Sequence, residues 1–320
     1  MEHLIVRDIP MDTLCFSGMR GKGLRHACVG SGRLVRSIWQ ARRILRERSA
    51  DVVLGMGGYI CVPGGIAAAT LGRPLVLMNA DHQLLLSNRL LAPLAHRIAF
   101  GLPGLDSLIS RKAVFTGNPV RPEIEALPPP EQRFADRQGP LRVLVMGGSQ
   151  GAQMLNEVVP RAIASLSPEQ RPLVLHQCGR GNEEVVRATY SSVGVADRVE
   201  IVSFIDNVAS ALGECDLAIC RSGAITVSEL CAGGVPSVLV PLRLGTTTHQ
   251  LSNARQMHVA QAAYCLDPED VRPERLAQIL REANRASLLK MAQRARARAQ
   301  PRAVSRLSGL LEQLVGRASH

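Results

Sequence analysis

The sequence predicts an α/β protein built from two open, doubly wound domains. Short apolar or β-branched runs recur along the chain, each ends in Gly, Pro or a polar turn, and a helical pattern follows. At a typical size of ~150 residues per domain, 320 residues suggest two domains. A hydrophobic fraction of 46% and a charged fraction of 20% are typical of a globular chain and exclude a disordered one.

Nine runs are predicted to be strands. Four lie in the first half, at 51–56, 74–78, 97–100 and 113–117, and five in the second, at 141–146, 172–176, 199–202, 217–220 and 236–240. Because helical patterns alternate with these runs, the strands of each half are expected to be parallel. Two such domains would face each other across a cleft lined by the carboxyl ends of both sheets.

Domain boundaries follow from composition. The stretch 118–140 carries six prolines among charged residues and has no apolar period, which predicts a linker. The predicted parts are an N-terminal domain (1–118), the linker (119–140), a second domain (141–285) and a C-terminal helix (286–320) that packs back across the domains.

Several classes of protein are excluded. No uncharged apolar run reaches the ~18 residues needed to span a bilayer, and the first residues do not form a secretory signal, which predicts a cytosolic location. The eight cysteines show neither Cys-x-x-Cys nor paired Cys/His spacing, which argues against a zinc site or a disulfide framework. Five Phe, three Tyr and one Trp offer few stacking platforms, which argues against nucleic acid as a partner.

Positive charge is concentrated near the N-terminus. Residues 20–48 hold nine basic residues and one acid, which gives +8 of the formal net charge of +11. The apolar residues of the helical stretch 33–48 recur on one face, with Trp39 and Ile44 beside it: Leu34, Val35, Ile38, Ala41 and Leu45. This pattern predicts either attachment to an anionic membrane surface or an ordinary surface helix whose apolar stripe packs on the sheet.

Three glycine-containing loops follow predicted strands. Gly147–Ala152 precedes a helical pattern, and such a loop lets backbone N–H groups and the positive helix end approach a phosphate. The sequence has no Gly-Lys-Ser/Thr here, so the loop is no P-loop, and a tight turn without ligand remains an alternative. Gly55–Tyr59 is a similar anion cradle in the first half, or else a place of close helix–sheet packing.

The third loop is Arg221–Glu229. A strand ends, Ser222 or Gly223 can cap, and a helix begins whose first turn would expose N–H groups to a phosphate. Glu229 follows further along this helix, where its carboxylate can accept hydrogen bonds from two vicinal ribose hydroxyls or be an ordinary solvated residue.

Six segments together resemble the MurG family of glycosyltransferases, in order and spacing: 55–59, 117–121, 147–152, 203–206, 221–229 and 250–254. The resemblance implies a GT-B fold of glycosyltransferase family 28, without a bound metal or cofactor. It implies inverting transfer of N-acetylglucosamine from UDP-N-acetylglucosamine to lipid I, the undecaprenyl-diphosphate-linked acceptor, which yields lipid II for peptidoglycan. It also implies a peripheral place on the cytoplasmic face of the bacterial inner membrane.

Site residues follow from the resemblance, position by position. Arg121 and Ser149 would serve the donor diphosphate, and the backbone at Ile205 would meet uracil. Glu229 would hold the ribose, and Gln250 would hold hydroxyls of the transferred sugar. The residues implied as the phosphate cradle are Ala224, Ile225, Thr226, Val227 and Ser228, and those of the acceptor-diphosphate loop are Gly57, Gly58 and Tyr59.

The chain also departs from the family pattern. Family members begin with a strand and a Gly-Gly-Thr-Gly-Gly-His loop whose His is a candidate general base, whereas Met1 here matches an internal position. We therefore expect a missing βα unit and impaired catalysis. Where the family usually has His-Glu-Gln-Asn-Gly, this chain has Met-Asn-Ala-Asp-His, so Asp81 stands at a ligand-contacting amide position. Asp81 and His82 are the remaining candidates for the base, and a surface role for His82 is the alternative.

Two other functions share this architecture. A UDP-N-acetylglucosamine 2-epimerase uses the same donor but has no reason to carry an arginine-rich amphipathic segment. A non-catalytic remnant would keep only nucleotide binding.

Overall fold

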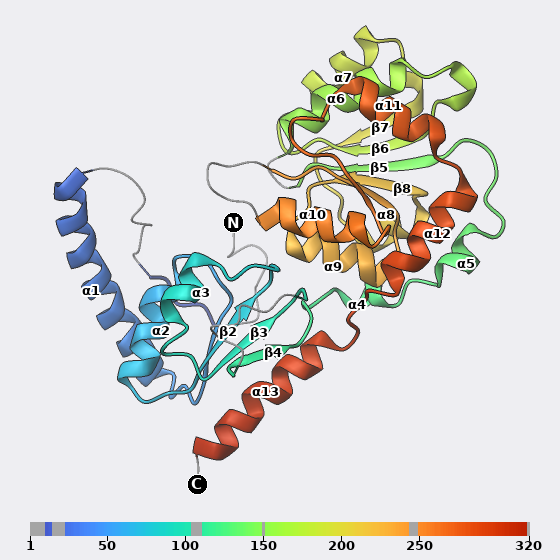
Figure 1. The fold of residues 1–320 in the computed structure, drawn as a ribbon. Coiled ribbons are helices and arrows are strands. Elements are labelled where there is room, and N and C mark those ends of the chain that lie inside the picture. The colour runs from blue at the N-terminus through green and yellow to red at the C-terminus, as the bar shows by residue number, and fades with distance from the viewer. Residues whose placement is uncertain (1–9, 15–22, 104–110, 149–150, 243–248, 319–320) are drawn as a thin grey trace. The chain divides into compact units, whose positions relative to one another are not determined.

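The computed structural model describes residues 10–14, 23–103, 111–148, 151–242 and 249–318 (Figure 1). The chain divides into two compact units. Unit 1 comprises residues 1–116 and 305–320, and unit 2 comprises residues 117–304.

Unit 1 contains a parallel sheet in the order β1-β2-β3-β4. Its strands are β1 (Val53–Gly55), β2 (Leu75–Asn79), β3 (Arg97–Phe100) and β4 (Ala113–Phe115). Its helices are α1 (Gly23–Glu47), α2 (Cys61–Thr70), α3 (Leu86–Leu91) and, at the end of the chain, α13 (Ala303–Ala318). All four described strands lie where the sequence predicts them.

The two faces of this sheet are covered by different parts of the chain. Helices α2 and α3 supply Ala68 and Leu91 to a core with Leu75, Leu77 and Ile98. On the other face, two leucines of α13 pack against the sheet. They form a second apolar cluster with three strand residues: Leu307, Leu314, Val76, Met78 and Ala99. Arg306 in α13 donates from Nε to the carbonyl oxygen of Thr116 at 2.8 Å. Residues more than 180 apart in sequence thus build one unit.

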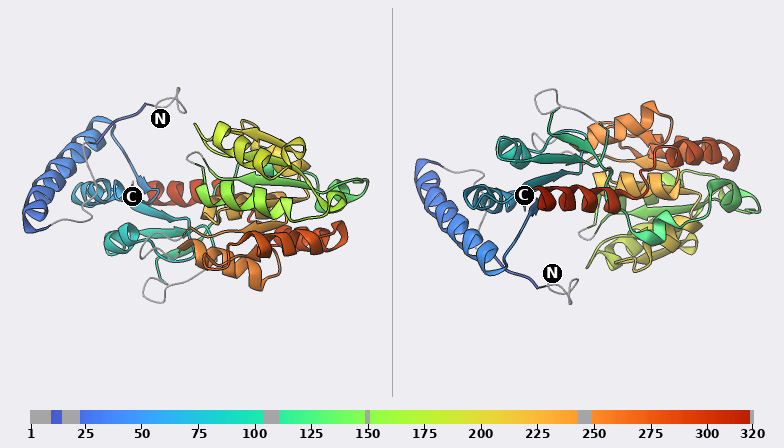
Figure 2. Two further views of the ribbon diagram at one scale, coloured as in Figure 1. Left: turned by 90° about the horizontal axis from the view of Figure 1, so that it is seen from above. Right: turned by 90° about the horizontal axis from the view of Figure 1, so that it is seen from below.

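Helix α1 packs against α2, and both views of Figure 2 show it alongside α2. Ser37 and Ala41 are buried, and Leu34, Ile38 and Leu45 are half-buried. Most of the predicted apolar stripe is therefore used inside unit 1. Val35 is the exception, because it is exposed together with Trp39, whose exposed fraction is 69%.

Unit 2 contains a six-stranded parallel sheet in the order β10-β9-β8-β5-β6-β7. Its strands are β5 (Arg142–Met146), β6 (Leu173–Gln177), β7 (Val199–Val202), β8 (Leu217–Cys220), β9 (Ser237–Leu239) and β10 (Tyr264–Cys265). The five predicted strands are confirmed, and β10 was missed. At two residues, β10 is too short for a periodic signal.

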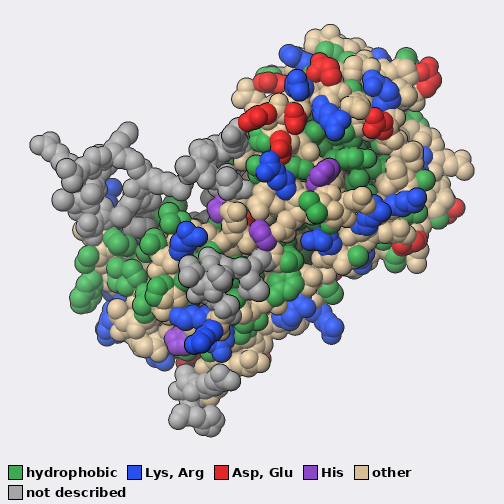
Figure 3. Space-filling view, viewed as in Figure 1, with side chains coloured by type: hydrophobic (Ala, Val, Ile, Leu, Met, Phe, Trp, Pro, Cys, Tyr) green, Lys and Arg blue, Asp and Glu red, His purple; other side chains and the backbone are tan. Residues whose placement is uncertain are grey.

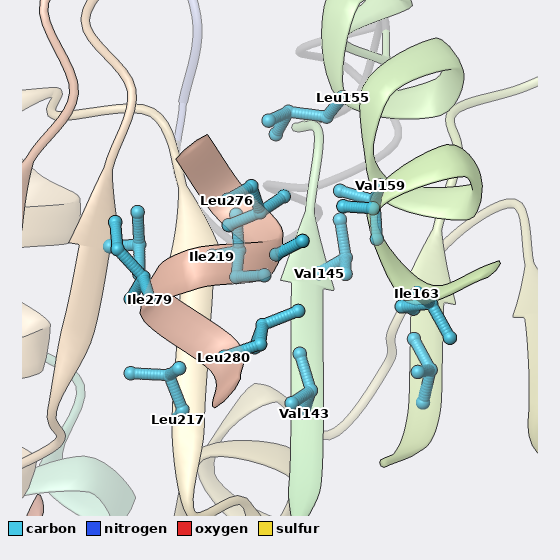
Figure 4. Packing of buried hydrophobic residues seen from close by; sticks show 14 of the residues in the cluster. Val143, Val145, Leu155, Val159, Ile163, Leu217, Ile219, Leu276, Ile279 and Leu280 are labelled. Atoms are coloured by element: carbon cyan, nitrogen blue, oxygen red, sulfur yellow. The ribbon is translucent and has the colours of Figure 1, made fainter. Parts of the chain in front are cut away.

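The helices of unit 2 are α4 (Pro122–Glu125), α5 (Pro130–Phe134), α6 (Gln153–Ala164), α7 (Glu183–Ser192), α8 (Val208–Glu214), α9 (Ala224–Gly233), α10 (His249–Val259), α11 (Pro273–Glu282) and α12 (Arg285–Arg296), with 3₁₀ turns η3 (Pro168–Gln170) and η4 (Ala196–Arg198). The core between α6, α11 and the sheet is apolar (Figure 4). There Val145 of β5 and Ile219 of β8 point toward Val159 and Leu276.

The proline-rich segment after Thr116 belongs to unit 2. Its short helices α4 and α5 bury Ile124 and Phe134, and Phe134 joins the main core. Near the other end, the predicted C-terminal helix is two helices, α12 and α13. They are separated at Pro301, which has no backbone N–H to donate, and at Arg302, which has φ = 59°.

Candidate functional site

The carboxyl ends of β5 and β8 mark the switch point of the unit 2 sheet. These strands are neighbours, but the chain leaves β5 through α6 toward β6 on one side and leaves β8 through α9 toward β9 on the other. Ligands of doubly wound sheets bind outside such a point. The N-cap residues of α6 and α9 are Ala152 and Gly223, and neither has a side chain that accepts a hydrogen bond from the first turn. Their first-turn N–H groups are therefore suited to an anion.

The loop before α6 is packed so closely that only glycine fits. A Cβ on Gly151 would lie 2.3 Å from the Cys178 carbonyl oxygen, and one on Gly147 would lie 2.7 Å from the Ala152 nitrogen. Gly148 and Gly151 also have φ of 80° and 74°. Ser149, the implied diphosphate residue, lies outside the described residues.

Of the two residues that the sequence offers as the cap of α9, Gly223 rather than Ser222 occupies the N-cap position. Ser222 does not cap the helix, because its hydroxyl donates to the Gln250 carbonyl oxygen at 2.8 Å. Asn253 donates in turn to the Ser222 carbonyl oxygen at 3.1 Å. The loop is thus tied to the first turns of α10, and this brings Gln250 beside the start of α9.

The implied phosphate cradle 224–228 contributes mainly backbone. Ala224 and Val227 are buried in the unit, whereas Ile225 is exposed. The Ser228 hydroxyl donates to the Ala224 carbonyl oxygen and accepts from the Asn118 amide, both at 2.9 Å. Thr226 is half-buried in the first turn. A phosphate at this place would be bound by first-turn N–H groups rather than by Ser228 or Val227 side chains.

Glu229 is a buried carboxylate one turn further along α9, with an exposed fraction of 8%. Its Oε1 lies 3.5 Å from Nε of Arg121. Arg121 is the N-cap residue of α4, and 55% of its side chain is exposed. Burial raises the pKa of Glu229, and the positive charge of Arg121 acts in the opposite direction. The structure therefore brings together two predicted site residues that lie 108 positions apart in sequence.

Two further predicted residues border the same edge of the sheet. Ile205 is half-buried in the loop that follows β7. The side-chain oxygen of Gln250 accepts from the Leu242 backbone nitrogen at 2.9 Å. A contact of Gln250 with a sugar hydroxyl would therefore use its amide nitrogen.

The candidates in unit 1 form a separate group. The Gly57–Tyr59 loop follows β1, Gly57 and Gly58 have φ of 91° and 80°, and Tyr59 is exposed. The thiol of Cys61 donates to the Gly57 carbonyl oxygen at 2.8 Å. The Asp81 carbonyl oxygen accepts from Asn79, and a ring nitrogen of His82 is hydrogen-bonded to the Pro103 carbonyl oxygen. Neither Asp81 nor His82 is thereby identified as a base.

Among the residues that the structure describes, no group of three or more His, Cys, Asp or Glu side chains could hold a metal ion. Within the same residues, no helix is long and apolar enough to cross a membrane.

Comparison with known families decides the identity of both halves. Residues 142–307 match the glycosyltransferase family 28 C-terminal domain, and residues 2–100 match the N-terminal domain of the same family. The chain belongs to glycosyltransferase family 28. The family and the GT-B type of fold predicted from the sequence are confirmed.

Relatives within family 28 carry a specific name. The protein of Methylibium petroleiphilum is 53% identical over 96% of this chain and 84% of its own length, and is named UDP-N-acetylglucosamine--N-acetylmuramyl-(pentapeptide) pyrophosphoryl-undecaprenol N-acetylglucosamine transferase. The Chromobacterium violaceum protein of the same name is 50% identical over 99% of this chain and 88% of its own.

A solved structure supports the same family. The crystal structure of Acinetobacter baumannii MurG is 30% identical, with a TM-score of 0.80, and the match covers 98% of this chain and 87% of that one. A structure described as a UDP-N-acetylglucosamine 2-epimerase of Listeria monocytogenes has a TM-score of 0.60 at 18% identity, covering 90% of this chain and 79% of its own. The latter likeness shows the fold alone.

Sequence reasoning missed the buried side chains that hydrogen-bond to the backbone of the loops before α6 and after β7. The main one is Gln177, which binds the backbone of Gly148 and Ser203. The second is Asn156, whose amide donates to the Cys178 carbonyl oxygen at 3.1 Å. A signal was present, because His176 and Gln177 are polar residues at the end of an apolar strand. A buried polar side chain in a parallel strand usually has a partner that requires it.

Proposed function

We propose that the protein transfers N-acetylglucosamine from UDP-N-acetylglucosamine to lipid I and so forms lipid II. The observation that carries the proposal is the site at the switch point of unit 2. Two helix N-termini without side-chain caps lie there beside the buried carboxylate of Glu229. The names of relatives at 53% and 50% identity supply the acceptor and the transferred sugar.

The chemistry of transfer requires a leaving diphosphate to be stabilised as the sugar departs. N–H groups at the starts of α6 and α9 would donate hydrogen bonds to the departing diphosphate and so stabilise its developing negative charge. The Arg121 guanidinium would add a positive charge once a ligand separates it from Glu229. Glu229 would accept hydrogen bonds from the ribose hydroxyls. Gly57–Tyr59 would hold the acceptor diphosphate.

Product analysis tests the reaction. Purified protein is incubated with UDP-N-acetylglucosamine and a lipid I analogue, and the products are separated by mass spectrometry. We expect a disaccharide product together with UDP. Epimerised donor, or UDP binding without any product, would replace the proposal with one of the two alternatives.

Glu229→Ala tests the donor site. The variant loses hydrogen bonds to a charged acceptor, so the binding free energy of UDP should weaken by ~1.5–3 kcal/mol in a calorimetric titration. Glu184→Ala, which removes an exposed glutamate from α7 of the same unit, is the control and should bind as the wild type does. Unchanged UDP affinity in Glu229→Ala would remove Glu229 from the site.

We further propose that unit 1 attaches the enzyme peripherally to the anionic cytoplasmic face of the inner membrane. The exposed Trp39 lines a hollow of about 690 Å³ on α1. The other residues that line it are four arginines, one amide and one acid: Arg36, Arg42, Arg43, Arg46, Gln40 and Glu47. In the view of Figure 3, most of the visible Asp and Glu side chains lie over unit 2, whereas Lys and Arg side chains lie over both units. Each basic residue near an anionic leaflet contributes ~1 kcal/mol.

Vesicle sedimentation tests the attachment. Arg36→Glu plus Arg46→Glu should weaken binding to anionic vesicles at least roughly tenfold and leave the weak binding to neutral vesicles unchanged. Arg42 is spared because it donates to the Thr70 carbonyl oxygen at 2.9 Å. The matched control makes the same charge change at two exposed arginines of unit 2, Arg161→Glu plus Arg187→Glu. Equal loss in both double variants, or binding indifferent to salt, would contradict attachment through α1.

A further inference from the structure

The last residue of β6, Gln177, is a buried amide that the proposed reaction does not use. Its exposed fraction is 5%. Its Oε1 accepts from the Gly148 nitrogen at 2.9 Å, and its Nε2 donates to the Gly148 carbonyl oxygen at 2.7 Å and to the Ser203 carbonyl oxygen at 3.1 Å. Both N–H bonds of the amide are thus used, and all three partners are backbone groups.

These partners belong to two different loops. Gly148 lies in the glycine loop before α6, where the donor diphosphate is proposed to bind. Ser203 begins the loop 203–206 after β7, where Ile205 is proposed to meet uracil. One side chain therefore fixes the two loops that would contact opposite ends of a nucleoside diphosphate.

We propose that Gln177 is a positioning residue that sets the spacing between the uracil loop and the diphosphate loop. The inference rests on the proposed donor. Gln177 would touch no ligand and would act through the backbone of Gly148 and Ser203. Loops held at the correct spacing before binding do not have to be ordered by the ligand, which strengthens binding.

The surroundings of Gln177 make it a firm anchor. Its own carbonyl oxygen accepts from the Gly147 nitrogen at 3.1 Å. The next residue, Cys178, receives two side-chain amides on its carbonyl oxygen, from Asn156 at 3.1 Å and from Asn182 at 3.0 Å. The end of β6 is therefore held by Asn156 of α6 and by Asn182, which precedes α7. These contacts fix the backbone from which the Gln177 side chain extends.

The test compares two ligands of different length. Uridine would contact the uracil loop and Glu229 but not the diphosphate loop, whereas UDP would span both loops. In Gln177→Met, which keeps the length of the side chain but loses all three hydrogen bonds, the ratio of the uridine Kd to the UDP Kd should fall roughly tenfold. In turnover, KM for the donor should rise while KM for the acceptor stays at the wild-type value.

Val174→Ala is the matched control. Val174 lies on the same strand and is buried in the core, but it does not contact either loop through a hydrogen bond. The variant should lower thermal stability and leave the ratio of the two Kd values unchanged. A folded Gln177→Met protein with the wild-type ratio would overturn the proposal, and so would an equal fall of the ratio in Val174→Ala.

Hydrogen exchange on the wild type tests the same contact without a substitution. The Gly148 amide donates to Gln177 and should exchange slowly in the ligand-free protein. Exchange at the rate of an unprotected amide would contradict preorganisation. Failure of the wild type to bind UDP at all would instead contradict the proposed donor, and with it the role of Gln177.

Discussion

The two glycine loops are built from similar sequences but are held in different ways. In unit 2, Gln177 binds both backbone groups of Gly148, and Gly151 lies against the Cys178 carbonyl oxygen. In unit 1, the hydrogen bond to the Gly57 carbonyl oxygen comes from the thiol of Cys61, and a Cβ on Gly58 would meet nothing within 4 Å.

This difference extends to charged groups. Asp216 of unit 2 has no exposed surface and pairs with Arg137 at 2.7 Å and Arg285 at 3.1 Å. In unit 1, Arg48 and Asp12 pair at 3.0 Å, but half of the Arg48 side chain is exposed. Unit 2 thus holds its glycine loop with a buried amide side chain and keeps the Asp216 carboxylate out of solvent. In the described part of unit 1 the glycine loop is held by the Cys61 thiol and by backbone bonds from Cys61 and Val62, and the Arg48–Asp12 pair is partly exposed.

The largest expected effect is on the buried charges. Asp216→Ala should lower the free energy of unfolding by about 3–5 kcal/mol, because it leaves Arg137 and Arg285 without their carboxylate and Arg142 N–H without its acceptor. Asp12→Ala, which breaks the exposed pair of unit 1, should cost less than about 1 kcal/mol. Chemical denaturation followed by circular dichroism measures both. Similar losses in the two variants would contradict the distinction between the units.

The next effect concerns Gly151. Gly151→Ala combines a left-handed backbone, at φ = 74°, with a collision against Cys178, so unfolding should be easier by about 2–4 kcal/mol. UDP affinity should fall with it, because the loop has to move. Gly181→Ala is a suitable control, since φ is 76° there but no atom lies within 4 Å of the added Cβ. A loss no greater than that of the control would show that the loop is less tightly packed than its geometry indicates.

A third test uses pH. Burial lowers the pKa of His176 to about 4, and its ring is hydrogen-bonded to Tyr190 at 2.9 Å and to Asn156 at 3.0 Å. Because the unfolded chain takes up a proton near pH 6.5 and the folded one only near 4, the contribution of His176 to stability is lost as pH falls through this window. Between pH 6.5 and 5 the loss should be about 1.5 kcal/mol.

His176→Gln should show a flatter pH dependence of unfolding over the same window. The control is His258→Gln, which replaces an exposed histidine in α10 of the same unit and should keep the wild-type slope. A slope that is unchanged in His176→Gln would show that other groups cause it.

Sequence reasoning found the elements whose signal is local. Nine strands and the starts of α6 and α9 are readable because apolar runs end in glycine or polar turns. Contacts between distant residues carry no such signal. Nothing in the sequence indicates that Arg137 pairs with Asp216, 79 positions away, or that Asn118 binds Ser228. The charge on α1 and most of its packed face were also readable, and the exceptions are Ser37, which is buried there, and Val35, which is exposed.

The smallest expected effect is at Gly58, and it separates strain from function. Since a Cβ has open space there, Gly58→Ala should cost only the left-handed backbone energy, about 1 kcal/mol, and Gly58→Asn should cost less because Asn tolerates this conformation. If the loop holds the acceptor diphosphate, both variants should raise KM for a lipid I analogue while the Kd for UDP, measured by calorimetry, stays unchanged. A fall in UDP affinity without a change in acceptor KM would mean that the Gly57–Tyr59 loop does not hold the acceptor and that the two glycine loops serve one ligand rather than two.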